Sequence, residues 1–370
     1  MTAPIPLGRP GRVLIGLLLL LTTALAFGPP VAAASGSGRA GRQQPYGGYL
    51  FAYFTGESTA DGEQIHLALS QGNDPLHWRE LGGGAPVLTS VLGEKGVRDP
   101  SIIRSPRGDK FYLLATDLKI YGNGDWDTAQ RHGSRSIMVW ESSDLVHWSE
   151  QRSVQVSPQA AGNTWAPEAF WDARRHQYMV FWSSELYAKD DSQHTAASHE
   201  RIMYATTRDF QHFTPARVWD DPGHSVIDST VVADGRTYYR FTKDERDPSA
   251  DAPCGKYVFE EKATDLLAPS WKPVAECIGK AAQGGPGIVD GEGPTVFKSN
   301  TAHTWYAFID EFTDRGYVPF ETTDLGSGQW TMSSDYELPA SPRHGTVVPI
   351  TRAEYNRLAA RWHVSRMTAG

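Results

Sequence analysis

Residues 49–54 read Tyr-Leu-Phe-Ala-Tyr-Phe, which has the length and composition of a buried β-strand. Four aromatic-rich stretches of the same kind follow along the chain. They are residues 111–115 (FYLLA), 178–182 (YMVFW), 238–241 (YYRF) and 305–309 (WYAFI). With Tyr49, Tyr112, Tyr178, Tyr239 and Tyr306 as markers, the intervals are 63, 66, 61 and 67 residues. The chain is therefore an internal repeat, which has to be recognised before any other element is assigned.

The repeated unit has the size of a four-stranded sheet. Each marker is followed by a second hydrophobic run and by a polar turn that ends in an aromatic residue. The turns span residues 73–78, 143–148, 208–213, 264–271 and 323–330. Radial repetition of such sheets protects their edges, so the sequence predicts an all-β, five-bladed β-propeller. A β-sandwich is the alternative, but its turns would be spaced more closely and would not repeat over this distance.

A further short strand with a polar residue at or near its start precedes each marker except the first. The polar residues are Asp99, Glu168, Asp228 and Glu292. The missing strand appears at the other end of the chain, as residues 344–350, beginning with His344. We expect it to complete the first blade and to close the ring. Because the innermost strands of a propeller all run the same way, we expect these five residues to meet at one end of the channel.

Four carboxylates and an imidazole at one place have a chemical consequence. Like charges in contact force their pKa values apart, so one carboxyl keeps a proton while another stays ionised. Paired general acid and base catalysis needs this arrangement. A single Asp before Pro or Ser is more often a turn cap than a catalytic group. Acids at four of five equivalent positions nevertheless favour a catalytic site.

The N-terminal residues carry the pattern of an export signal. Arg9 and Arg12 precede an apolar run at residues 13–27, and small residues follow at 31–34. A membrane anchor is the alternative, but the run is shorter than the roughly 20 apolar residues of a membrane span. We therefore expect a cleaved signal at residues 1–34, a flexible leader at 35–45, a propeller domain at 46–362 and secretion of the mature protein.

Composition narrows the class of partner. The formal net charge is −8, which argues against nucleic acid, because phosphate binding depends mostly on Lys and Arg. No segment after the signal is apolar enough to cross a bilayer, so we expect no membrane partner, and we expect a monomer. The 12 Trp, 15 Tyr and 14 Phe suit both β-structure and sugar stacking. In an exported chain, the two cysteines, Cys254 and Cys277, predict one structural disulfide.

Four segments resemble the signature segments of glycoside hydrolase family 43. They are residues 97–102 (VRDPSI), 165–168 (WAPE), 227–230 (IDST) and 291–294 (GEGP). The resemblance runs in the family's order over residues 46–358. It implies a five-bladed propeller that hydrolyses arabinose- or xylose-containing plant cell-wall glycans or oligosaccharides with inversion of configuration.

The same resemblance implies roles for three carboxylates. Asp99 would be the general base that activates water, and Glu292 the general acid that protonates the departing oxygen. Asp228 would orient the acid and keep the pKa of Glu292 high. Inversion requires the carboxyls of Asp99 and Glu292 to lie roughly 6.5–9.5 Å apart. Glu168 stands where many members have Asp, and we interpret it as a substrate contact or as a support behind one.

Other residues are candidates for binding. Trp165 is the expected sugar platform, with core packing as the alternative. His344 resembles the family's channel histidine, which in some members helps to hold a calcium ion or its waters. No cofactor is expected to be required, and a structural calcium in the channel is an open expectation. Five charged residues that end strands are either site contacts or a solvated rim: Lys243, Asp244, Glu245, Asp310 and Glu311.

Two other functions are compatible with a propeller. A sialidase-like hydrolase would have Asp-box turns, but the glycine of that motif is absent from residues 143–148, and no arginine cluster occupies the strand starts. A carbohydrate-binding propeller without catalysis would not need all three carboxylates.

Overall fold

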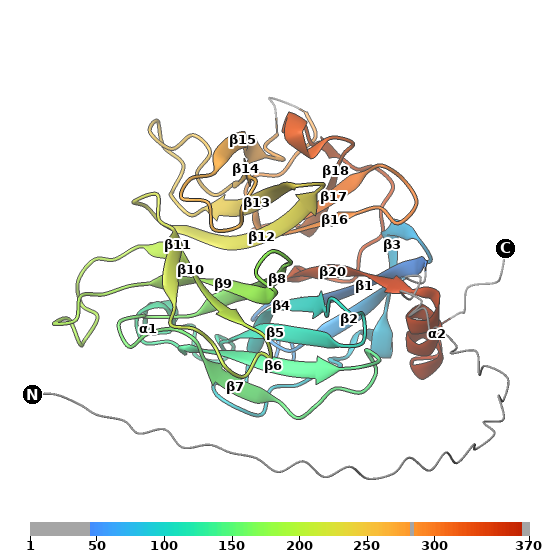
Figure 1. Cartoon of the computed structure of the whole chain (residues 1–370), viewed down its shortest axis with the longest axis horizontal. Coiled ribbons are helices and arrows are strands. Elements are labelled where there is room, and N and C mark those ends of the chain that lie inside the picture. The colour runs from blue at the N-terminus through green and yellow to red at the C-terminus, as the bar shows by residue number, and fades with distance from the viewer. Residues whose placement is uncertain (1–44, 282–284, 365–370) are drawn as a thin grey trace, which may run out of the picture. The chain divides into compact units, whose positions relative to one another are not determined.

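The computed structural model describes residues 45–281 and 285–364 of the chain. These residues form five four-stranded antiparallel sheets arranged around a common centre (Figure 1). The predicted all-β, five-bladed propeller is thereby confirmed. The predicted export signal, and the leader apart from residue 45, lie outside the described residues.

Each sheet forms one blade, and its strands are named from the innermost to the outermost. Blade 1 contains β20 (Arg343–Thr351), β1 (Tyr46–Phe54), β2 (His66–Gln71) and β3 (Asp74–Glu80). Blade 2 contains β4 (Val97–Arg104), β5 (Phe111–Asp117), β6 (Ser136–Ser142) and β7 (Arg152–Gln155). Blade 3 contains β8 (Trp165–Asp172), β9 (Gln177–Glu185), β10 (Glu200–Thr207) and β11 (Arg217–Asp220). Blade 4 contains β12 (Val226–Asp234), β13 (Thr237–Asp244), β14 (Val258–Ala263) and β15 (Lys272–Ile278). Blade 5 contains β16 (Glu292–Lys298), β17 (Trp305–Glu311), β18 (Gly316–Thr322) and β19 (Thr331–Met332).

The ring closes as the sequence predicts. Strand β20 from the C-terminal end lies beside β1 from the N-terminal end, red against blue in Figure 1. The two strands pair antiparallel, with Leu50 opposite Val348 and Phe51 opposite Val347. The blade that starts the chain is therefore completed by its end.

In the described part of the chain, five apolar clusters form the core, one between each pair of neighbouring blades, and a sixth, smaller cluster contains Leu118, Ile120 and Ala129. Successive side chains of a strand point to opposite faces, so one strand contributes to two clusters. In β5, Leu113 packs toward blade 1, whereas Leu114 packs toward blade 3. In β9, Val180 packs toward blade 2 and Phe181 toward blade 4. Burial on both faces explains why the marker strands read as continuous apolar runs rather than as alternating ones.

The five polar turns share one hydrogen bond. In each turn an aspartate Oδ1 accepts from the backbone N–H two residues later, at 2.8–2.9 Å, as in an Asx turn. These aspartates are Asp74, Asp144, Asp209, Asp265 and Asp324. The shared turn chemistry supports the five-fold repeat independently of the strands.

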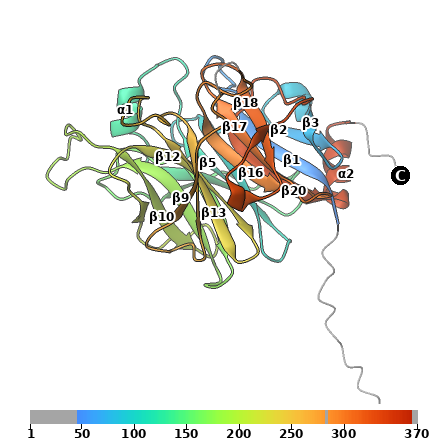
Figure 2. The ribbon, with the colours of Figure 1, turned by 90° about the horizontal axis from the view of Figure 1, so that it is seen from above.

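Among the residues that the structure describes, four short helical segments accompany the sheets: α1 (Trp126–Arg131), α2 (Arg352–Arg361), and the 3₁₀ turns η1 (Leu81–Gly84) and η2 (Leu325–Ser327). Both α1 and α2 were unforeseen. Helix α2 begins with a capping box formed by Thr351 and Glu354, a signal that is present in the sequence. Figures 1 and 2 place α1 and α2 on opposite sides of the domain. No helix among residues 45–281 and 285–364 has the length and hydropathy required to span a membrane.

Candidate active site

Every innermost strand carries a β-bulge at the same place. In β4 the ladder pairs Arg98 with Thr116 and then Ser101 with Leu114, so two residues oppose one. The ladders of β8, β12, β16 and β20 break in the same way. The first bulge residue has a positive φ in four of the five strands: 50° at Asp99, 50° at Ala166, 57° at Asp228 and 51° at Gly293. Non-glycine residues with positive φ are strained, and such strain concentrates at functional sites.

The bulges correct the predicted equivalence of the five strand starts. The residues that occupy the same bulge position are Asp99, Ala166, Asp228, Gly293 and His344. Glu168 lies two residues after its bulge residue, and Glu292 lies one residue before its own. The prediction aligned the strands by their acids, whereas the bulge sets the register. The prolines that follow Asp99, Ala166 and Gly293 would have given the correct alignment.

Side chains from the second strand of a blade hold the bulge residues in place. Thr116 of β5 donates its Oγ1–H to Asp99 Oδ2 at 2.6 Å, and the threonine oxygen accepts from the backbone N–H of Ala166 at 2.7 Å. Ser183 of β9 accepts from the backbone N–H of Asp228 at 3.2 Å. These contacts link neighbouring blades, so the carboxylates are fixed by the ring itself.

His344 lies between two of the predicted carboxylates. Its Nδ1 is 3.6 Å from Asp99 Oδ1 and 3.6 Å from Asp228 Oδ2. The backbone N–H of Gly293 donates to the same Asp228 oxygen at 3.0 Å. The backbone N–H of His344 donates to Asp310 Oδ2 at 3.2 Å. The imidazole therefore lies between carboxylates of blades 2 and 4, and the backbone of His344 is bonded to blade 5.

Glu292 lies in a network of basic residues. Lys243 Nζ is 2.7 Å from its Oε2, and Arg343 Nη2 is 3.1 Å from its Oε1. Lys243 is only 2% exposed and also pairs with Glu245 at 2.6 Å. Arg343 pairs in addition with Asp310 at 2.6 Å. Both contacts of Glu292 are charge-assisted hydrogen bonds, the stronger kind.

These groups line one cavity of about 400 Å³. Asp99, Asp228, Glu292 and His344 contribute to its wall, together with Lys243 and Arg343. Its aromatic lining consists of Trp126, Trp165 and Phe312. A cavity of this size, with charged groups converging on it and an aromatic wall, has the character of a site for a small polar ligand.

The protonation states of the two acids differ. Burial raises the pKa of Asp228 to about 7, and the charges of Glu292 and Asp99 act in the same direction. Burial acts likewise on Glu292, but Lys243 and Arg343 outweigh it and hold the pKa of its carboxyl well below its usual range. The structure therefore favours a proton on Asp228 and a negative charge on Glu292. This order is the reverse of the one implied by the family resemblance.

The surroundings of His344 bear on the expected calcium. Burial lowers the pKa of His344, but the nearby carboxylates of Asp228, Asp99 and Glu168 raise it more, so the net shift is upward. An imidazolium repels a cation. Within the described part of the chain, no group of three or more His, Cys, Asp or Glu is arranged to hold a metal ion. The calcium in the channel stays a prediction, with His344 as the residue that would help to hold it or its waters.

A comparison with protein families identifies the family of this domain. A family described as "Probable glycosyl hydrolase domain", related to glycoside hydrolase family 43, matches residues 44–356. The chain belongs to this family. It is a glycoside hydrolase domain of the family-43 type, and its cavity is the candidate active site of that hydrolase.

Several individual proteins are similar to this glycoside hydrolase domain. An α-L-arabinofuranosidase of Bifidobacterium longum is 38% identical over 244 residues, which are 62% of this chain and 23% of that protein. The chain thus spans about a quarter of the curated relative that it matches. A thermostable family-43 glycoside hydrolase structure is 20% identical, with a TM-score of 0.46, covering 68% of this chain and 77% of the other. The catalytic domain of a Coprinopsis cinerea GH62 α-L-arabinofuranosidase is 13% identical, with a TM-score of 0.44, covering 67% and 70%.

Two predicted binding residues of the glycoside hydrolase, Trp165 and Glu168, lie differently relative to the cavity. Trp165 lines the cavity and also packs against the apolar cluster beneath α1, so its role as a sugar platform stays a prediction. Glu168 is absent from the cavity lining and lies buried in the channel, where burial raises its pKa to about 7. Its role, as a substrate contact or as a support behind one, stays a prediction.

Sequence reasoning did not assign Lys243 and Arg343 to the site of the glycoside hydrolase. For Lys243 the sequence left a site contact and a solvated rim open, and the side chain is buried against Glu292. Its position opposite Ile227, at the bulge of the neighbouring strand, is the feature that brings it to the cavity. Arg343 occupies in β20 the position that Glu292 occupies in β16, directly before the bulge.

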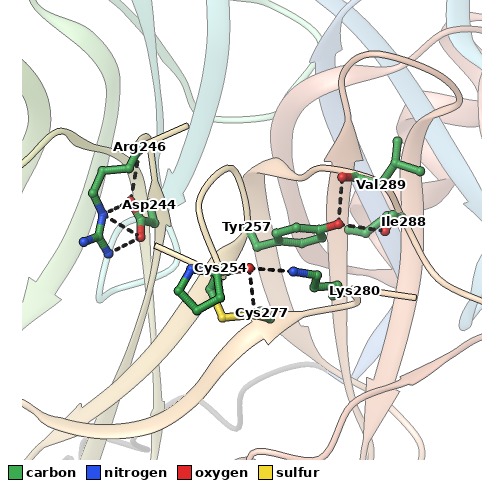
Figure 3. The surroundings of a disulfide bond; sticks show 9 residues. Asp244, Arg246, Cys254, Tyr257, Cys277, Lys280, Ile288 and Val289 are labelled. Carbon is green, nitrogen blue, oxygen red and sulfur yellow. Dashed lines mark hydrogen bonds and ion pairs between the residues drawn. A yellow bond between two sulfur atoms is a disulfide. The ribbon is translucent and has the colours of Figure 1, made fainter. Parts of the chain in front are cut away.

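The two cysteines stabilise the wall beside Glu292. Cys254 and Cys277 form a disulfide, with their Cα atoms 4.9 Å apart (Figure 3). Next to it, the Tyr257 hydroxyl donates to the Val289 carbonyl at 2.7 Å, which ties the β13–β14 loop to the segment before β16. Lys256 of the same loop lines the cavity. Cys254 lies in the β13–β14 loop and Cys277 in β15, so the disulfide ties the loop that carries Lys256 to the outermost strand of blade 4.

Proposed function

We propose that this protein is a secreted α-L-arabinofuranosidase that removes arabinofuranosyl groups from plant cell-wall glycans with inversion of configuration. The single observation that supports this most strongly is the convergence of Asp99, Asp228 and Glu292 on one cavity, although 193 residues separate the first from the last. The similarity to the B. longum α-L-arabinofuranosidase supports the choice of sugar. The signal-like pattern of residues 1–34 supports secretion.

The proposed reaction is a single displacement. Asp99 takes a proton from a water molecule as the water oxygen attacks the anomeric carbon. The bond between that carbon and the glycosidic oxygen breaks, and Glu292 gives a proton to the departing oxygen. Asp99 is suited to the role of base, because Thr116 fixes one of its oxygens at 2.6 Å, while the other lies 3.6 Å from His344 Nδ1, beyond hydrogen-bond distance, and can accept a proton.

The proton that Glu292 donates must be held at the site before the glycosidic bond breaks. Asp228 and Glu292 interact strongly, so they titrate as a pair with apparent pKa values that belong to both. The pair holds one proton near neutral pH, and the basic residues around Glu292 favour its residence on Asp228. We propose that Glu292 delivers this proton after the pair has redistributed it, with Asp228 as the reservoir.

Leaving-group dependence tests these roles directly. Asp99→Asn, Asp228→Asn and Glu292→Gln are compared on aryl α-L-arabinofuranosides whose phenols differ in acidity. A good leaving group departs without a proton, so the loss in Glu292→Gln is expected to shrink as the phenol becomes more acidic. The loss in Asp99→Asn, of about 10²–10⁴-fold, is expected to be the same for all phenols.

Two results would change the proposal. Leaving-group dependence in Asp228→Asn instead of Glu292→Gln would transfer the role of acid to Asp228, as the electrostatics favour. Turnover retained by both Asp99→Asn and Glu292→Gln, with folding verified by circular dichroism, would reject this catalytic site. Wild-type protein that binds the arabinosides without hydrolysing them would indicate a carbohydrate-binding propeller.

A further inference from the structure

Of the three aromatic residues that line the cavity, Trp126 is the exposed one. Among the described residues, six large hydrophobic side chains are strongly exposed, and Trp126 is one of them at 42%. It is the member of that group that lines the cavity with Asp99, Asp228 and Glu292. Those carboxylates are largely buried, so the indole lies further out, at the mouth.

The ring of Trp126 is held in place from two sides. The guanidinium of Arg98 lies 5.0 Å from the ring centroid, and Trp165 meets the ring edge-on at 6.2 Å and 83°. Arg98 is itself buried and pairs with Glu57 and Glu63, each at 3.4 Å. The support of the indole is therefore rigid, and an aromatic group fixed before binding loses little entropy when a ligand arrives.

The helix that carries Trp126 is also anchored. Asp125 caps α1 by accepting from the Thr128 N–H at 3.1 Å. From the end of α1, Arg131 donates to the carbonyls of His194 and Ala196 at 3.0 and 3.1 Å, which ties the helix to blade 3. Gln130, one turn after Trp126, lines the same cavity and offers a polar group beside the indole.

A rigid, exposed indole beside a polar group matches the chemistry of a sugar ring. The apolar C–H face of a pyranose or furanose packs on an aromatic face, and its hydroxyls bond to neighbouring polar groups. The sugar that is released must reach the buried carboxylates. The ring that lies on Trp126 therefore belongs to the part of the glycan beyond the cleaved bond.

We propose that Trp126 is the platform for the glycan chain that bears the arabinofuranosyl group, so that an oligosaccharide or polysaccharide is a better substrate than a small glycoside. This inference rests on the proposed function. The residue that selects the glycan then lies on α1, a helix of blade 2 that is not one of its four strands.

The test compares two probes and three variants. The probes are an arabinoxylo-oligosaccharide and 4-nitrophenyl α-L-arabinofuranoside, and the readout is kcat and KM for each. Trp126→Ala is expected to lose about tenfold more kcat/KM on the oligosaccharide than on the aryl glycoside, mostly through KM, since tenfold corresponds to about 1.4 kcal/mol of lost binding. Trp126→Phe is expected to recover most of the loss, because it restores an aromatic face.

Tyr121→Ala is the matched control. Tyr121 is 40% exposed and lies in the same segment, but it lines a neighbouring cavity and not the one with the carboxylates. Its replacement is expected to leave both activities unchanged. An equal loss on both probes in Trp126→Ala, or no loss on the oligosaccharide, would overturn the inference.

Failure of the proposed function can be recognised separately. If the wild-type protein hydrolyses neither probe, the proposed activity is wrong, and binding of the same oligosaccharide is measured by titration calorimetry. Weaker binding by Trp126→Ala than by the wild type and Tyr121→Ala then supports the platform. Equal binding by all three proteins, or no binding by any, overturns it.

Discussion

Lys243 Nζ lies 2.7 Å from Oε2 of Glu292, across the boundary between blades 4 and 5. The ammonium is buried and is shared with Glu245. It lowers the pKa of both Glu292 and Asp228, although burial raises each of them. Lys243 therefore helps to set the pH at which the acid pair loses its proton.

Removing this charge is expected to shift the pH profile. In Lys243→Met the pKa values of Glu292 and Asp228 both rise, so the alkaline limb of kcat/KM moves to higher pH by about one unit. The measurement is kcat/KM against pH on an aryl arabinofuranoside. Lys110→Met, which removes a half-exposed lysine paired with Glu141, serves as the control and should leave the limb in place. An unmoved limb in Lys243→Met would refute this role.

The bulge at Gly293 gives a second prediction. A Cβ at this position would lie 2.5 Å from Cγ of His344, so Gly293→Ala must displace the imidazole from Asp99 and Asp228. We expect at least about a tenfold loss of kcat/KM, the scale expected when a group at the site is misplaced. Gly235→Ala is the control, because φ is +60° there and no atom lies within 4 Å of the added carbon. Similar losses in both variants would mean that positive φ alone, and not His344, is responsible.

Glu168 predicts how stability depends on pH. Its carboxyl has a pKa of about 7 in the folded protein, raised from 4.5 chiefly by burial. Between pH 4.5 and about pH 7 the unfolded chain has released this proton and the folded protein keeps it. The free energy of unfolding therefore falls as pH rises, and the loss is complete above pH 7. The free energy of unfolding of Glu168→Gln, taken relative to the wild type, is therefore expected to increase by roughly 1–3 kcal/mol from pH 5 to pH 8. Urea unfolding at both pH values measures it.

Exposed Glu150 supplies the control for this experiment. Glu150→Gln should follow the wild type at both pH values. A difference between Glu168→Gln and wild type that does not change with pH would show that Glu168 is ionised throughout.

The disulfide is expected to contribute mainly to stability. Closing a loop with a sequence separation of 23 residues typically stabilises a fold by about 2–4 kcal/mol. The double variant Cys254→Ser, Cys277→Ser should unfold at lower urea concentration by a corresponding amount, and the wild type in reducing agent should match it. An unchanged midpoint in both would indicate that Tyr257 and its contacts hold the two loops without the cross-link.

The sequence was sufficient to predict the propeller, because the same chemistry recurs five times. The marker tyrosines, the aspartate turns and the C-terminal strand each repeat one physical solution, and repetition makes a weak local signal strong. Helix α2 was missed despite its Thr351 and Glu354 capping box, since it lies outside the repeat.

The site was predicted less completely, because it depends on register. Asp99, Asp228 and His344 share the bulge position, and they lie together as expected. Glu168 was aligned with the other strand starts, because an offset of two residues from the bulge cannot be seen without the ladder. Lys243 comes from a second strand, where no repeated motif marks it, so its pairing with Glu292 is visible only in three dimensions.

The anomer that forms first distinguishes a single displacement from a double displacement. Proton NMR of the wild-type protein acting on 4-nitrophenyl α-L-arabinofuranoside would follow the sugar before it mutarotates. A single displacement by Asp99 and Glu292 predicts that β-L-arabinose appears first and the α-anomer later. Initial release of the α-anomer would contradict the account, because it requires a covalent intermediate and a different role for these carboxylates.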